Sequence, residues 1–223
     1  FLSAIGNMPN TKTSNCFYDL LTIEENTYSS YCEKYLVYND SRADDDIILN
    51  APLDLSIDWG GKWNFCTVSQ FYNMDVNIQK NLYVINPRKY QDMIYDFIKY
   101  YRNHPRKEVN LFNDPQGNKQ VPNSTLTYSQ DVIRILVSNG WKVNHLSANM
   151  HYVLHHEKHR IFSKVLRGNA GFGLKINMYN ANETYVSMAN SKLITKKVKG
   201  ITKFQKNKDS ETNSYVLPEF APH

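Results

Sequence analysis

With 223 residues and 41% hydrophobic content, the chain is long enough to bury one core and too apolar to be disordered. No apolar run approaches the roughly 20 residues that span a bilayer, and Phe1 to Pro9 lack the charged and apolar regions of a signal peptide. The three cysteines show no metal-ligand spacing, so we expect a protein of a reducing compartment, neither secreted nor membrane-bound. The net charge of +5 is modest and does not by itself indicate a nucleic-acid partner.

Residues 1–50 differ in composition from the rest of the chain. Residues 16–38 are rich in tyrosine and acids and predict one or two short helices, and residues 39–46 predict a polar, acidic linker. A strongly apolar run follows, so we place a domain boundary near Ala51, with residues 1–50 before it and residues 51–223 after it.

Three strands are predicted after this boundary. The pattern of apolar residues indicates strands at 54–59, 63–72 and 80–86, with a Gly-Gly turn between the first two. Because the connections are short, we expect an antiparallel meander. Apolar residues at helical spacing then predict a helix over residues 90–101.

Strands and helices alternate in the second half of the chain. The predicted elements are strand 109–113, helix 129–136, strand 141–146, helix 151–166, strand 174–178 and helix 183–196. Helices that cross between strands imply parallel pairing. We therefore predict an α/β fold with a mixed sheet, an antiparallel three-strand meander plus parallel strands, flanked by helices. This is the ribonuclease-H-like plan.

Two aspartates stand at the ends of predicted strands. Asp58 lies in the first strand, just before the Gly-Gly turn, and Asp114 directly follows the fourth strand. In the predicted sheet these strands are neighbours, so the carboxylates would lie side by side and repel each other unless a cation lay between them. Mg²⁺ or Mn²⁺ bound by carboxylates is the usual arrangement for phosphodiester cleavage, with two ions about 3.5–4 Å apart. Each aspartate alone is more typical of a turn or a helix cap.

The sequence resembles the nuclease domain of viral, tailed-phage type terminase large subunits in the order and spacing of its segments. Residues 55–61 followed by 64–68 are similar to the first nuclease motif of that family, an acid-bearing strand, a tight turn and a returning strand. Residues 109–117 are similar to the second motif, and residues 140–146 to the strand that follows it. The resemblance runs from about Ala51 to the end of the chain.

The resemblance implies a metal-dependent endonuclease that cuts concatemeric viral DNA during genome packaging. Asp58 and Asp114 match the first two of three clustered acids that hold Mg²⁺ or Mn²⁺. The third acid usually follows a histidine, and here the chain ends at His223, so we expect it just beyond that residue and the domain to be truncated. Asp209 is a weaker candidate for the third ligand, as is Glu211.

The resemblance also implies partners and a location. The partners are double-stranded DNA, an ATPase motor domain, a portal and a small terminase subunit, and no membrane is among them. The location is the cytoplasm of a bacterial host. The phosphate-binding loop of a motor is missing here, so residues 1–50 would be the tail of a preceding ATPase domain or the linker from it.

Lysines crowd into one late stretch of the sequence. Such a run can follow a phosphate backbone or can simply be a solvated face. We predict that it binds nucleic acid through Lys196, Lys197, Lys199, Lys203, Lys206 and Lys208.

Other functions remain open at this point. His151, His155 and His159 share one face of a predicted helix and can in principle bind a transition metal, although no further ligand is evident nearby. With Lys158 and other cations close by, this face is more typical of one that meets DNA or solvent. A non-catalytic DNA-binding or assembly module of the packaging machine would also explain the lysines. A transposase or resolvase of the same fold is a third possibility, but these enzymes usually carry the third acid on a late helix within the chain.

Overall fold

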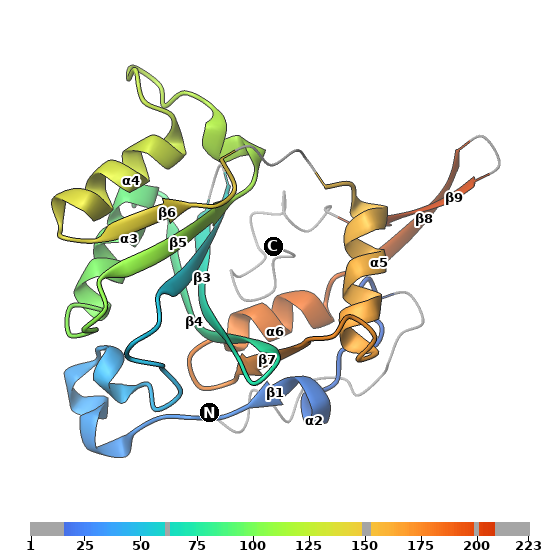
Figure 1. Ribbon diagram of the computed structural model, residues 1–223. Coiled ribbons are helices and arrows are strands. Elements are labelled where there is room, and N and C mark those ends of the chain that lie inside the picture. The colour runs from blue at the N-terminus through green and yellow to red at the C-terminus, as the bar shows by residue number, and fades with distance from the viewer. Residues whose placement is uncertain (1–15, 61–62, 149–152, 199–200, 208–223) are drawn as a thin grey trace.

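The computed structural model describes residues 16–60, 63–148, 153–198 and 201–207 (Figure 1). Seven strands form one mixed sheet, and two further strands form a separate hairpin. Among the described helices, none is long and apolar enough to cross a membrane.

The predicted meander forms the centre of the sheet. It consists of β2 (Leu53–Trp59), β3 (Trp63–Tyr72) and β4 (Asp75–Ile85), which pair antiparallel in sequence order. β4 begins earlier than the predicted strand at residue 80. The first half of β4 carries Asn77 and Gln79, whose side chains are buried. A strand is predicted from buried apolar residues, so this polar half was missed.

Parallel strands extend the sheet on both sides, as predicted. β5 (Glu108–Asn113) pairs with β2, and β6 (Lys142–His145) pairs with β5. On the other side β7 (Gly173–Asn177) pairs with β4. The fold is therefore α/β with the ribonuclease-H-like arrangement of strands.

Helices cover the two faces of the sheet. α3 (Tyr90–Tyr100) and α4 (Tyr128–Ser138) pack on one face, where they bury the apolar side chains of β2 and β5 in the main core. α5 (His155–Leu166) and α6 (Asn182–Ala189) lie on the other side and form a second core with β7. The face that carries α5 and α6 is the one that holds the candidate site.

The segment before residue 51 joins the main sheet. It contains the short helix α2 (Ile23–Asn26), the strand β1 (Thr27–Tyr28), which pairs parallel with β7, and the 3₁₀ helices η1 (Glu33–Tyr38) and η2 (Ser41–Ala43). Within the predicted linker the side chains of Asp40 and Asp44 are buried. That residues 1–50 are the tail of a preceding ATPase domain, or the linker from it, stays a prediction.

The predicted helix over residues 183–196 is wrong in its second half. α6 ends at Ala189, and β8 (Leu193–Val198) then pairs with β9 (Ile201–Lys206) in an antiparallel hairpin that projects beside α5 (Figure 1). The β-branched residues at 194, 195 and 198 favour a strand, and strand pairing overrides the helical spacing.

Candidate active site

The alternation of β2 gives the sheet one apolar and one polar face. Leu53, Leu55 and Ile57 are buried against α3 and α4. Because successive side chains of a strand point to opposite faces, Ser56 and Asp58 project from the other face, toward α5 and α6. Asp58 is exposed at the end of the strand.

The pairing of β2 with β5 brings Asp114 beside Asp58. Ile57 is level with Asn113, so the next residues of the two parallel strands, Asp58 and Asp114, leave the same edge of the sheet. Burial raises the pKa of Asp114, and the negative charge of Asp58 raises it further. The two carboxylates predicted from the sequence are thus brought together.

Asp114 is held by the turn that it begins. Its Oδ1 accepts a hydrogen bond of 3.0 Å from the backbone N–H of Gln116, at the start of the 3₁₀ helix η3 (Pro115–Asn118). Its backbone oxygen accepts from the N–H of Gly117, also at 3.0 Å. Asp114 therefore caps the start of η3, one of the roles that its sequence position is typical of. Its carboxylate also interacts electrostatically with Asp58.

Lys158 of the helix α5 acts on Asp114 through its positive charge. This charge lowers the pKa of Asp114, against the effects of burial and of Asp58. Lys158 lies between the two histidines of the predicted metal face, His155 and His159. From the sequence, Lys158 is placed on a helix face that meets DNA or solvent. Its effect on Asp114 could not be predicted, because it depends on how α5 packs over the sheet.

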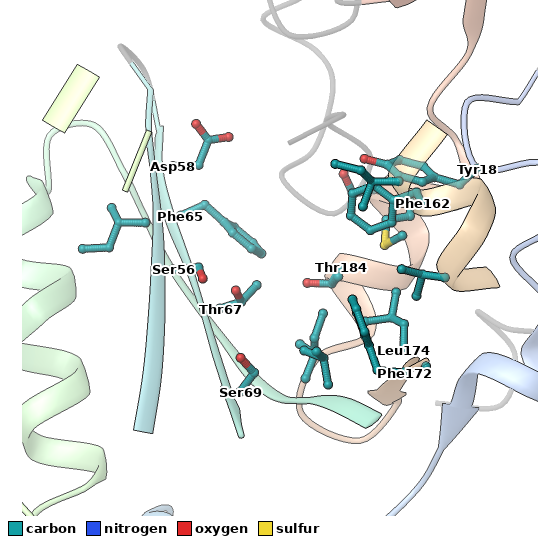
Figure 2. A pocket seen from close by; sticks show the side chains of 18 residues that line it. Tyr18, Ser56, Asp58, Phe65, Thr67, Ser69, Phe162, Phe172, Leu174 and Thr184 are labelled. Atoms are coloured by element: carbon teal, nitrogen blue, oxygen red, sulfur yellow. The ribbon is translucent and has the colours of Figure 1, made fainter. Parts of the chain in front are cut away.

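A cavity of about 420 Å³ opens beside Asp58, between the polar face of the sheet and the helices α5 and α6. Figure 2 shows Asp58, Ser56, Thr67 and Ser69 on the sheet side and Phe162 on the helix side. The lining is mostly apolar, on the sheet side as well as on the helix side, and Asp58 is the only carboxylate among the described residues that line it. Of the two aspartates, the cavity therefore meets Asp58.

The donor set fits a hard divalent cation. Two neighbouring carboxylates supply only oxygen atoms, which Mg²⁺ and Mn²⁺ prefer, and Mg²⁺ commonly takes one or two carboxylates with water and phosphate oxygens as the remaining ligands. Within the described residues, no group of three or more His, Cys, Asp and Glu side chains is placed to hold a metal. Asp209, Glu211 and His223, which bear on the third acid, lie outside the described residues.

A buried hydrogen-bond network lies behind Asp114, on the reverse face of β5. Asn113 Oδ1 accepts hydrogen bonds from His145 Nε2 at 2.7 Å and from Ser147 Oγ at 3.1 Å. Burial lowers the pKa of His145. None of these three residues was predicted as a site residue. Their sequence positions do not indicate that they lie near Asp114, and they meet only because β5 pairs with β6.

The predicted nucleic-acid-binding lysines lie on the projecting hairpin. Lys197 is exposed on β8, and Lys203, the third residue of β9, is half-buried. Lys206 is buried, with 9% of its surface exposed. Lys196 lies on β8 opposite Lys203. Lys199 and Lys208 lie outside the described residues.

The histidines of α5 are engaged in packing. His159 Nδ1 lies 2.9 Å from the backbone oxygen of Phe17, and its ring packs on Phe17 and Phe204. The ring of His155 also contacts Phe17. His151 lies outside the described residues. This helix face packs against the N-terminal segment and the hairpin.

The fold is similar to that of large terminases from phages. The large terminase of a thermophilic bacteriophage, in complex with ATP-gamma-S, aligns over 88% of this chain and 43% of that one, with a TM-score of 0.53 and 15% identity. A second crystal form of the same protein aligns over 87% and 41%, with a TM-score of 0.52 and 15% identity. The large terminase nuclease of the thermophilic phage G20c aligns over 86% and 89%, with a TM-score of 0.47 and 10% identity.

The chain thus spans less than half the length of the first of these terminases. The sequence matches no protein-family model, and it matches no curated protein. At these identities, the likeness to that terminase shows a shared fold and leaves the site residues to be argued from this chain.

Proposed function

We propose that this chain is a metal-dependent DNA endonuclease domain that cuts concatemeric viral DNA during genome packaging. The observation that carries the proposal is the pairing of Asp58 and Asp114 at one edge of a ribonuclease-H-like sheet. The fold shared with the large terminase of a thermophilic bacteriophage supports the packaging role.

Each group of the site has a task in this proposal. Asp58 and Asp114 hold Mg²⁺ or Mn²⁺, as a two-metal site once the third ligand is supplied. Ions held there would supply activation of the attacking water and stabilisation of the leaving oxygen of the phosphodiester. Lys158 faces the pair with a positive charge, which orients the scissile phosphate and offsets the repulsion between phosphate and carboxylate.

DNA contacts are assigned to the projecting hairpin. Lys196, Lys197 and Lys203 lie around its turn, where they contact phosphates without reading sequence. The substrate is double-stranded DNA, and the further partners are an ATPase motor, a portal and a small terminase subunit. The setting is the cytoplasm of a bacterial host.

Plasmid cleavage by matched variants tests the proposal. Supercoiled DNA is incubated with Mn²⁺, Mg²⁺ or EDTA and with wild type, Asp58→Asn, Asp114→Asn or Asp54→Asn. Asp54 provides the control because it lies on the same face of β2 and binds Asn110 at 2.8 Å. The same set is repeated in a chain extended about 30 residues beyond His223, to supply the expected third acid.

We expect metal-dependent cutting that is lost in Asp58→Asn and Asp114→Asn and kept in Asp54→Asn, with no variant melting at a lower temperature than the wild type. Full activity in either site variant would refute the assignment. DNA binding without cutting, in both the shorter and the extended chain, would instead favour the non-catalytic DNA-binding module.

A further inference from the structure

The backbone at Asp114 is fixed by a network of side chains on the opposite face of the sheet. Asn113, whose exposed fraction is 9%, donates from Nδ2 to the backbone oxygen of Asp114 at 2.7 Å. Its backbone N–H donates to Ser147 Oγ at 2.8 Å, and Ser147 returns a hydrogen bond to Asn113 Oδ1. Both hydrogen-bonding ends of the amide are thus used.

His145 completes this network from β6. Its Nε2 lies 2.7 Å from Asn113 Oδ1, and an amide oxygen can only accept, so Nε2 carries the proton and donates it. His145 lies opposite Leu111 in the pairing of β5 with β6, so its ring lies on the covered face and not on the face of Asp114. The imidazole therefore acts on Asp114 only through Asn113.

Gly117 packs closely against the side chain of Asn113. A Cβ atom added to Gly117 would lie 2.4 Å from Asn113 Nδ2 and 2.8 Å from Trp59 Nε1, both closer than such contacts allow. The backbone oxygen of Gly117 in turn accepts from Ser129 Oγ at 2.9 Å, which fixes η3 to the start of α4. The end of β5 is thus held from two directions.

We propose that His145, Ser147 and Asn113 are positioning residues that set the direction of the Asp114 carboxylate and thereby the metal affinity of the site. This inference rests on the proposed function, because it assumes that Asp114 holds a divalent cation. Groups that orient a metal ligand typically change metal affinity about 10–100-fold when they are removed.

Calorimetric titration with Mn²⁺ tests the network without requiring cleavage. We expect His145→Ala to weaken Mn²⁺ binding roughly tenfold. His145→Gln, whose amide N–H can replace Nε2–H, should restore most of the affinity. Asn144→Ala provides the matched control, because Asn144 is the preceding residue of β6 and binds Glu108 and Asn110 instead. Gly117→Ala, which displaces Asn113 from the other side, should weaken binding as His145→Ala does.

The outcomes separate this inference from the proposed function. If neither the wild type nor the chain extended beyond His223 binds Mn²⁺, or if Asp114→Asn binds it equally well, the proposed function fails and the inference with it. If Asp114→Asn loses binding while His145→Ala and Gly117→Ala keep wild-type affinity, the inference alone is overturned. A lower melting temperature with unchanged affinity, or equal weakening in Asn144→Ala, would likewise reduce the network to a structural role.

Discussion

At the scale of single residues, the proximity of Asp58 and Asp114 lowers the folding stability of the metal-free chain. Burial and the charge of Asp58 raise the pKa of Asp114 above that of an ordinary aspartate. An acid whose pKa is higher in the folded state stabilises that state while it is protonated, and this contribution is lost as the pH rises through the folded pKa. The metal-free chain should therefore bear an electrostatic cost at this site at neutral pH.

Removing the charge of Asp58 should relieve this cost. We predict that Asp58→Asn lowers the pKa of Asp114 in the metal-free chain and raises the melting temperature at pH 7 on the order of 2 °C. Carboxyl ¹³C NMR titration measures the pKa, and Asp54→Asn serves as the control. An unchanged pKa of Asp114 would mean that the two carboxylates do not interact.

The sequence alone could predict the carboxylate pair but not its surroundings. Asp58 and Asp114 each follow a recognisable strand, and parallel pairing of those strands makes them neighbours. Lys158 approaches only because α5 packs over the polar face of the sheet. Asn113, His145 and Ser147 meet because β5 and β6 pair in one particular register, which the pattern of apolar residues does not specify.

At the scale of elements, the meander and the alternating second half were predictable because each strand has its own apolar run. The hairpin of β8 and β9 was not. Its first strand follows α6 after only three residues, and its lysines and threonines give no apolar face. Only the pairing of Leu193–Val198 with Ile201–Lys206 defines these residues as strands.

The hairpin should contribute to DNA affinity through charge. We predict that the double substitution Lys196→Ala and Lys203→Ala, at positions paired across the two strands, reduces the slope of log K against log salt by about 1.8, since each phosphate contact contributes about 0.9. Fluorescence anisotropy with labelled duplex DNA at several salt concentrations measures this slope. Lys99→Ala, an exposed lysine on α3, should leave it unchanged. The same slope in the double variant and the wild type would exclude the hairpin from the interface.

At the scale of the whole molecule, the segment before residue 51 is fixed to the sheet by buried polar groups. Tyr100 donates to Asp44 Oδ1 at 2.7 Å, and Asn180 donates to the same oxygen. Tyr28 and Asn177 both donate to Asp46 Oδ2. These contacts connect the segment with α3 and with the residues around β7, so it contributes to the stability of the folded unit.

The folding stability should depend on pH through Asp44. Burial raises the pKa of Asp44 to about 7, whereas an ordinary aspartate has 3.8. Between these values the unfolded chain loses the proton and the folded chain keeps it, so the free energy of unfolding should fall as pH rises from about 4 to 7.

Asp44→Asn should weaken this dependence and stabilise the chain at pH 8 on the order of 3 kcal/mol. Urea denaturation across this pH range measures the effect. Asp45→Asn, at the exposed neighbouring residue, should behave as wild type. A wild-type pH profile in Asp44→Asn would show that the carboxyl is not protonated in the folded chain.

The central claim is that Asp58 and Asp114 together hold a divalent cation, and anomalous diffraction from a crystal soaked in Mn²⁺ tests it most directly. We predict an anomalous peak at coordination distance from an oxygen atom of each carboxylate, beside the cavity that Asp58 lines. The peak should vanish in Asp114→Asn and persist in Asp54→Asn. Manganese at other sites only, or a peak that remains in Asp114→Asn, would contradict the assignment.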